Sequence, residues 1–134
     1  MSTLSFEIHV EQDHAGAITR VTEELKKEGF GVLSRIDVHQ AFKEKIGVDF
    51  RPYTILGACN PQLAHRALSE QPEVGVLLPC NVTVEADPKG GSLVRVIDPE
   101  QMLNVGDLGA DATLREVGAE AERRLKRVVK ALGG

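Results

Sequence analysis

The sequence predicts an α+β fold, in which a mainly antiparallel sheet of about five strands carries helices on one face. Three patterns predict this fold. Apolar and polar residues alternate near the N-terminus, a turn-rich run separates two alternating segments in the second half, and an apolar stripe at helical spacing lies near the C-terminus. A chain of 134 residues can bury one core, so we expect a single domain over residues 1–134.

The first part of the chain predicts a strand, a helix and a second strand. Residues 4–10 have the period of two that places one face of a strand in the core. Asp13 is the expected N-cap of a helix that reaches about Glu28, and Gly29 supplies the left-handed residue that ends it. The second strand is expected over residues 30–36.

A short helix and a third strand are predicted next. Asp37, followed three residues later by Gln40, predicts a capping box for a helix that ends at Gly47. Residues 53–59 are apolar on both faces, which predicts a buried strand. Tyr53 and the four phenylalanines are expected to fill the core.

The third strand runs directly into another helix at Cys59. Asn60 and Pro61 are favoured N-cap and first-turn residues, and Pro72 ends this helix. A thiol at that position faces free backbone amides and the positive end of the helix dipole, which predicts a lowered pKa for Cys59. The alternative is that Cys59 is a small buried apolar residue.

A hairpin is predicted in the second half of the chain. Residues 76–85 alternate, with Cys80 on the buried face, and Pro79 within this run predicts an edge strand or a bulge. Residues 87–91 supply the turn, and residues 93–97 form the partner strand.

A long helix closes the predicted fold. Asp98 and Pro99 end the last strand, and Thr113 with Glu116 predicts a second capping box. The helix is expected to continue to about residue 132. It carries a narrow apolar stripe, suited to packing on a sheet. The stripe consists of Leu114, Val117, Ala121, Leu125, Val128 and Leu132.

Composition argues against several classes of function. The formal net charge is −4, and the one dense basic run, residues 123–130, follows acidic residues on the predicted last helix, so we expect no nucleic-acid partner. No apolar run approaches the roughly 20 residues that a membrane span needs, so we expect no membrane association. Residues 1–10 lack the pattern of a signal peptide. We therefore expect a cytoplasmic protein in which Cys59 and Cys80 are free thiols.

Recognisable catalytic and cofactor motifs are lacking. The sequence has neither a Gly-x-Ser-x-Gly elbow nor a phosphate loop, so we expect no cofactor. A metal site formed by Cys59, Cys80 and His65 is a weaker alternative, because the spacing of these residues matches no ligand motif.

Other polar residues are expected at the surface. Carboxylates such as Glu85 are expected at turns, where they contribute to solubility. Three histidines fall on an outward strand face or in the first turn of a helix, and we expect them to contact solvent: His9, His14 and His39.

Several segments together resemble a known family. They are Asn60-Pro61-x-Leu63-Ala64, Gly75-x-Leu77-Leu78-Pro79-Cys80-Asn81-Val82, and Gly29-Phe30 before a strand with Asp37 after it. In this set and its spacing, residues 10–103 resemble the domain-of-unknown-function family 302. The resemblance implies a TATA-binding-protein-like architecture of one strand, one helix, four strands of a curved antiparallel sheet and a terminal helix, with two short helices inserted. It also implies a homodimer, and it implies no established activity.

We therefore expect a non-enzymatic, homodimeric module that binds a small ligand between the sheet and its helices. The candidate ligand-binding residues are Cys59, Asn60 and Cys80, at the start of a helix and beside it. One alternative is a protein-interaction or regulatory domain that acts through an exposed sheet face. The other is a thiol-based redox protein in which Cys59 attacks and Cys80 resolves.

Overall fold

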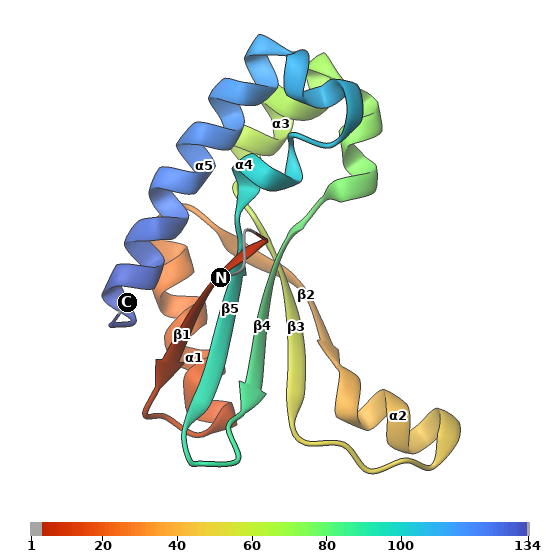
Figure 1. The fold of residues 1–134 in the computed structure, drawn as a ribbon, viewed down its shortest axis with the longest axis vertical. Helices are drawn as coiled ribbons and strands as arrows, with labels where there is room; N and C mark the ends of the chain where they lie inside the picture. The colour runs from red at the N-terminus through yellow and green to blue at the C-terminus, as the bar shows by residue number, and fades with distance from the viewer. Residues whose placement is uncertain (1–3, 134) are drawn as a thin grey trace.

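The sheet has five antiparallel strands in the order β1-β5-β4-β3-β2 and is not closed into a barrel (Figure 1). The structure, a computed structural model, describes residues 4–133; residues 1–3 of the N-terminal segment and residue 134 lie outside the described part. The strands are β1 (Ser5–Val10), β2 (Gly31–Asp37), β3 (Tyr53–Cys59), β4 (Cys80–Ala86) and β5 (Ser92–Ile97). The predicted α+β class is confirmed.

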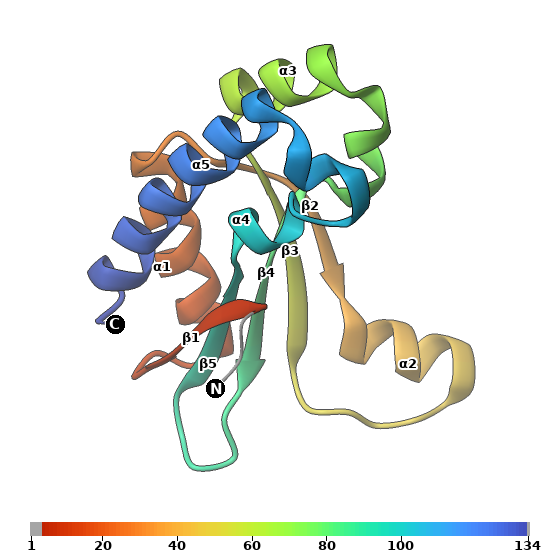
Figure 2. The same ribbon diagram turned by 45° about the horizontal axis from the view of Figure 1, so that its top comes forward.

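Two long helices cover one face of this sheet. Helix α1 follows β1 and packs against β4 and β5, and α5 lies beside α1 across the same face (Figures 1 and 2). Shorter helices and two 3-10 segments lie at the ends of the sheet, with α2 at the end opposite to α3. The bounds are α1 (His14–Lys27), α2 (Val38–Ile46), α3 (Pro61–Glu70), η1 (Pro72–Leu77), α4 (Pro99–Met102), η2 (Gly106–Ala110) and α5 (Ala112–Ala131).

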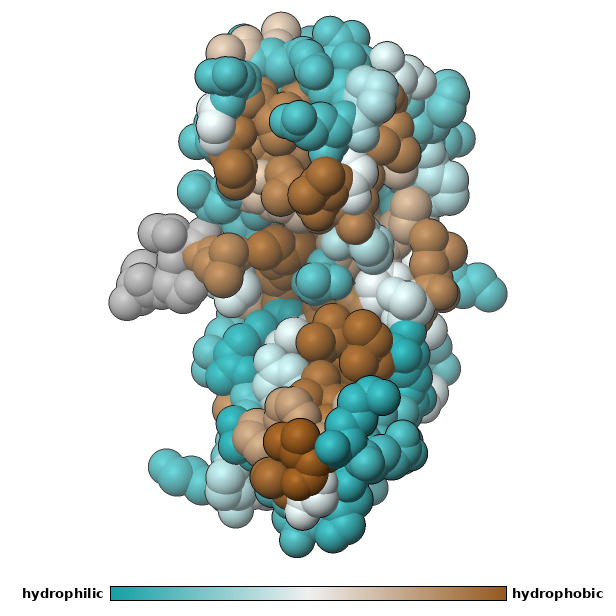
Figure 3. Space-filling model, turned by 90° about the vertical axis from the view of Figure 1, so that its right-hand side faces the viewer, coloured by the Kyte–Doolittle hydropathy of each residue, from teal (hydrophilic) through white to brown (hydrophobic). Residues whose placement is uncertain are grey.

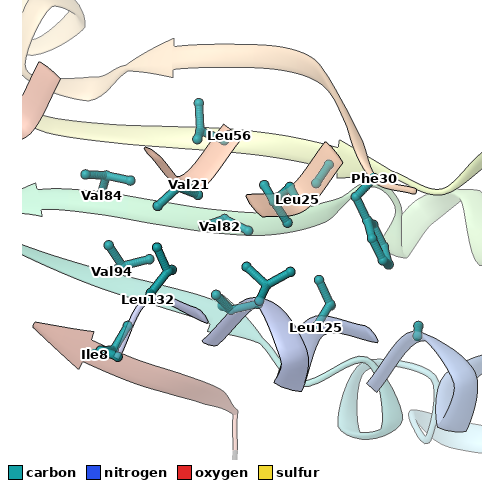
Figure 4. Close-up of a cluster of buried hydrophobic side chains, with 14 of the residues drawn as sticks. Ile8, Val21, Leu25, Phe30, Leu56, Val82, Val84, Val94, Leu125 and Leu132 are labelled. Carbon is teal, nitrogen blue, oxygen red and sulfur yellow. The ribbon is translucent and has the colours of Figure 1, made fainter. Parts of the chain in front are cut away.

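The core lies between the sheet and these two helices. Alternate residues of the strands point toward the helices, and the register sets Ile8 beside Val94 and Val94 beside Val84. Val21 and Leu25 of α1 point toward the same interior as Leu125 of α5 (Figure 4). All six residues of the stripe predicted for the last helix are buried. Burying each such side chain stabilises the fold by roughly 1.5–3 kcal/mol before entropy is counted.

The helix caps predicted at Asp13, Gly29 and Asn60 are present. The Asp13 side chain accepts a hydrogen bond from the Gly16 backbone N–H at 2.8 Å, and Gly29 has the expected positive φ of 84° after the helix. Asn60 caps α3 by accepting from the Leu63 N–H at 3.2 Å. These caps fix the directions in which the chain leaves β1 and β3.

Two predicted capping boxes are wrong. Asp37 makes no side-chain cap bond, because its carboxylate accepts hydrogen bonds from the Thr54 hydroxyl and the Arg35 guanidinium. The N-cap of α5 is Asp111, two residues before Thr113, and it accepts from the Leu114 N–H at 3.0 Å.

The predicted long strand around Pro79 is also shorter than expected. Residues 72–77 form the 3-10 segment η1, in which Val76 is 84% exposed, so the predicted buried face does not extend to Val76. Its other part is confirmed, because Cys80, Val82 and Val84 are buried. Strand β4 begins only at Cys80, after the cis peptide bond between Leu78 and Pro79. Because β4 has neighbours on both sides, the edge predicted from Pro79 is wrong.

Aromatic residues fill less of the core than predicted. Phe30 is fully buried, but Phe42, Phe50 and Tyr53 form a partly exposed cluster beside α2. The ring centroids of Phe42 and Phe50 are 5.3 Å apart, and the guanidinium of Arg51 lies 4.4 Å from the centroid of Phe50. Within residues 4–133, no helix is both long and apolar enough to cross a bilayer.

Candidate functional site

A small apolar hollow lies at the α3 end of the sheet, where β3 ends and β4 begins. Its volume is about 40 Å³. Residues from the strands, from α3 and α4, and from α5 line it, so four parts of the chain must fold together to form it. The lining consists of Phe30, Ala58, Cys59, Asn60, Leu63, Ala64, Ala67, Leu78, Pro79, Cys80, Pro99, Met102, Leu103, Val117 and Ala121. We call this site the apolar hollow.

The predicted candidates Cys59, Asn60 and Cys80 all line the apolar hollow. The antiparallel register sets Cys80 of β4 opposite Ala58 of β3, the residue before Cys59, so the two cysteines lie on adjacent strands at the same end of the sheet. Their side chains leave the sheet on opposite faces, because successive residues of a strand alternate. Cys80 is buried, whereas Cys59 is partly exposed, and both are free thiols. Of the two thiols, Cys59 is therefore the one nearer to solvent.

Asn60 has a structural role in addition to its place in the lining. It is 6% exposed, and its side-chain oxygen is occupied by the N-cap bond to α3. A Cβ atom at Gly29 would lie 2.9 Å from the Asn60 side-chain nitrogen, so the turn after α1 packs closely on this amide. Asn60 thus holds the end of β3, α3 and the α1–β2 turn in place.

The thiols are not activated in the way that the helix start suggested. Burial raises the pKa of the Cys59 thiol above its ordinary value of 9.0. Burial, together with the neighbouring Cys59, raises the pKa of Cys80 to about 11. The apolar lining disfavours the charged thiolate. The predicted lowering of the Cys59 pKa is therefore wrong, and both residues are neutral thiols near pH 7.

The weaker metal set of Cys59, Cys80 and His65 is not assembled. His65 is exposed on α3 and does not line the apolar hollow. Among the described residues, no three His, Cys, Asp or Glu side chains are grouped so as to hold a metal ion. The third sulfur atom in the lining belongs instead to Met102 of α4. Sequence reasoning missed it, since a methionine in a loop-rich segment carries no signal of its own.

The size of the apolar hollow limits what it can hold. One water needs roughly 10–15 Å³ by a comparable measure, so a volume of about 40 Å³ accommodates only a few heavy atoms. The carbon-rich lining favours an apolar or sulfur-binding group over a hydrated ion. An extended metabolite fits only if most of it stays outside.

A second site, which is a polar cluster, lies on the helix-covered face of the sheet, near the starts of α1 and α2. The buried Thr54 hydroxyl donates its hydrogen to Asp37 at 2.8 Å and lies 3.0 Å from His14 Nε2. Because a hydroxyl has one hydrogen to donate, His14 Nε2 must be the protonated nitrogen and donate to the Thr54 oxygen. The rings of His14 and His39 meet edge to face, with centroids 5.6 Å apart. The expected exposure of His14 and His39 is wrong, because both are partly buried. His14 directly follows Asp13, and His39 lies two residues after Asp37, so the sequence does show that each histidine is close to an aspartate at a helix start.

This cluster has the features of a structural network and not of a nucleophilic site. Thr54 is fully buried, so no substrate reaches its hydroxyl. Burial, with a smaller contribution from His39, lowers the pKa of His14 below 6.5. Burial alone would raise the pKa of Asp37, but hydrogen bonds from Thr54 and Arg35 outweigh it and lower that pKa.

The opposite face of the sheet carries a charged network centred on Glu85. This residue lies within β4, not at a turn as predicted, and is 5% exposed. Arg95 and Arg51 both donate to its carboxylate, and Arg95 also donates to Glu7 at 3.1 Å. Burial alone would raise the pKa of Glu85, but the two arginines lower it. Cross-strand pairing thus neutralises the carboxylate where it lies on the sheet.

Comparisons with known proteins agree with this fold and offer no activity. A crystal structure of the uncharacterized conserved protein DUF302 from Bacillus stearothermophilus is 34% identical to the chain, with a TM-score of 0.84. The alignment covers 96% of this chain and 98% of that one. The comparison with curated proteins returns no match. The model of a family described as "Domain of unknown function DUF302" matches residues 6–132, a longer span than the residues that suggested it. The chain therefore belongs to the DUF302 family, whose function is unknown.

Proposed function

We propose that the protein is a non-enzymatic module that binds a small apolar or sulfur-seeking ligand in the apolar hollow. The observation that carries this proposal is the hollow itself, an apolar space of about 40 Å³ that is lined by both cysteines of the chain. Empty space in a protein interior costs stability, because its lining atoms lose dispersion contacts. A ligand that fills the space recovers those contacts.

The absence of activated groups near the hollow favours binding over catalysis. The raised thiol pKa values disfavour a nucleophilic thiolate. The polar oxygen of Asn60 is already hydrogen-bonded to a backbone amide. A site built in this way holds a ligand by shape and soft contacts.

Xenon tests whether the apolar hollow admits a ligand. Methyl-resolved NMR of the protein under xenon pressure should show saturable shifts of the Leu63, Ala64 and Ala67 methyl groups. Ala64→Leu, at a partly exposed lining position, should fill the space and abolish the shifts while the protein stays folded. Shifts that are absent from the natural protein, or unchanged in Ala64→Leu, would remove the proposal.

A second proposal, self-association, is favoured by a different observation. Among the described residues, β2 is an edge strand with β3 on one side only, and its side chains Leu33 and Ile36 are 71% and 52% exposed. The adjoining α2 segment also exposes Ile46 and Val48, and Figure 3 shows apolar surface on this side of the molecule. An exposed apolar edge strand is a template for pairing with another strand.

A second copy of the chain is the partner that the β2 edge fits. Arg35 and Asp37 flank Ile36 and have opposite charges. Antiparallel pairing of two copies about Ile36 sets Arg35 of each copy opposite Asp37 of the other, which is a favourable cross-strand pair. The same pairing covers the exposed Ile36 side chains.

Sedimentation equilibrium tests the second proposal directly. The natural protein should sediment as a dimer, and Ile36→Lys should sediment as a monomer because a charge then lies at the centre of the interface. Leu68→Lys is the matched control, since Leu68 is a partly exposed leucine on α3, away from β2. A monomeric natural protein, or a dimer that survives Ile36→Lys, would exclude pairing through β2.

A further inference from the structure

A wide surface groove is lined by residues of the two 3-10 segments, η1 and η2. Its volume is about 810 Å³, far larger than that of the apolar hollow. We call it the η1–η2 groove. It shares no lining residue with the apolar hollow and includes no residue of β2, so it is a site distinct from both proposals above. Its lining consists of Gln71, Glu73, Val76, Leu77, Val105, Gly106, Asp107 and Leu108.

Contacts within the chain hold both segments that line the groove. Val74 anchors η1, because its side chain is fully buried in the core. The side-chain amide of Gln71, just before η1, donates to the carboxylate of Asp111, just after η2, at 3.4 Å. The Arg115 guanidinium of α5 donates to the Gly109 carbonyl of η2 at 3.0 Å. A partner therefore meets a groove that is already formed, which lowers the entropy cost of binding.

The apolar residues of the groove are open to solvent. Val76 and Val105 are 84% and 54% exposed, and Leu77 and Leu108 are partly buried beside them. Figure 3 shows apolar surface among polar side chains in the upper part of this side of the molecule, where α3 and the start of α5 lie in Figure 1. A small-molecule site encloses most of its ligand, which side chains this exposed do not do. An apolar patch with polar neighbours is typical of a protein interaction site.

The charges of the groove all have one sign. Glu73 of η1 and Asp107 of η2 are exposed, and neither carboxylate has a hydrogen-bond or ion-pair partner within residues 4–133. Among these residues, no Lys, Arg or His lines the groove. The guanidinium of Arg115 is directed to a backbone carbonyl instead. The groove is therefore complementary to cationic groups that accompany an apolar surface.

We propose that the η1–η2 groove binds a segment of another protein in which aliphatic side chains are flanked by Lys or Arg. The aliphatic side chains cover Val76 and Val105, and the cationic groups pair with Glu73 and Asp107. An acidic segment would meet charges of its own sign, and a purely polar basic segment would leave both valines in water. Ion pairs at exposed positions mainly speed association and fix the choice of partner, and salt screens them.

Fluorescence polarisation of the full chain with a labelled synthetic peptide, Arg-Arg-Leu-Leu-Arg-Arg, tests this proposal. We expect saturable binding below about 1 mM protein, with an affinity that weakens as the salt concentration rises. Asp107→Lys sets a charge of the peptide's own sign in the groove, and Val76→Ser removes an apolar contact. Each should weaken binding roughly fivefold or more. Glu23→Lys on α1 and Val48→Ser after α2 are the matched controls at exposed positions, and both should leave the affinity unchanged.

The other outcomes each overturn the proposal. Binding that does not saturate, or an equal loss in Glu23→Lys and Asp107→Lys, would show attraction to net charge and no site in the groove. Equal binding of Arg-Arg-Ser-Ser-Arg-Arg would exclude a contribution from the valines. Displacement of the peptide by an equal concentration of cadaverine, a linear aliphatic diamine, would assign the groove to small organic cations. If Asp107→Lys fails to fold, Glu73→Lys makes the same test from η1.

Discussion

Gly57 lies where β2, β3 and the ring of Pro79 meet. A Cβ atom at this position would lie 2.2 Å from the Ser34 hydroxyl oxygen and 2.7 Å from Cγ of Pro79. Gly57→Ala should therefore lower the free energy of unfolding by roughly 1–3 kcal/mol through overpacking. Urea denaturation measures this change.

Gly31→Ala is the matched control, because nothing lies within 4 Å of a Cβ atom built on Gly31 of the neighbouring strand. Its effect should stay within about 0.5 kcal/mol. Equal losses for the two variants would show that the close packing around Gly57 is not what the substitution disturbs.

His14 makes the stability of the fold depend on pH. Its pKa is lowered from 6.5 in the folded chain, mainly by burial, so the unfolded chain takes up the proton first as pH falls. Stability is therefore full above pH 6.5 and decreases as pH falls through that value toward the folded pKa. Asp37, whose pKa is lowered from 3.8, contributes only at more acidic pH.

Urea midpoints measured between about pH 8 and pH 5 should reveal this loss. His14→Gln retains an amide donor for Thr54 and should flatten the profile. The control His65→Gln changes an exposed histidine and should not. A profile of the same slope in His14→Gln would assign the pH dependence to other groups.

At the residue scale, sequence reasoning located Cys59, Asn60 and Cys80 because each lies at a boundary between elements. Strand register, which no local pattern specifies, sets Cys80 opposite Ala58, the residue before Cys59. Met102 could not be predicted from the sequence, since its place in the lining of the apolar hollow depends on where α4 packs. The direction of the Cys59 pKa was missed for the same reason: burial depends on residues distant in sequence.

At the scale of elements, the helix caps show how local signals compete. Asp111 and Thr113 are both good N-cap residues, and the helix begins at the earlier one, where the Asp111 carboxylate reaches the Leu114 N–H. Asp111→Ala should lower the melting temperature more than Thr113→Ala, because only the former leaves that amide without its partner. Differential scanning calorimetry of the two variants decides this, and the reverse order would restore the predicted capping box.

Strand β4 shows the limit of alternation as a signal. The parity of Val76 and Leu78 matched that of Cys80, yet the first two belong to η1 and the turn after it. Alternation over a few residues does not distinguish a strand from a 3-10 segment that follows a proline. Strands with turn residues on both sides, such as β5, were predicted to within one residue.

At the scale of the whole molecule, the order of elements and the sheet class followed from binary patterning, because each apolar face needs a partner surface. The outward course of α2 did not follow, although its apolar residues were recognised. None of them is buried in the core: Phe42 contacts Phe50 in an aromatic cluster at the surface, and Ile46 is exposed. Likewise, the Glu85 network required strand order, since its arginines come from β5 and from the residues before β3.

The central claim is that the apolar hollow is a binding site and not a packing defect. Native mass spectrometry of freshly purified protein, kept reduced and free of oxygen, tests it most directly. The account predicts one added mass per chain in the natural protein, absent from Cys59→Ser. Identical bare masses for both proteins would contradict it and leave Cys59 and Cys80 as packing residues.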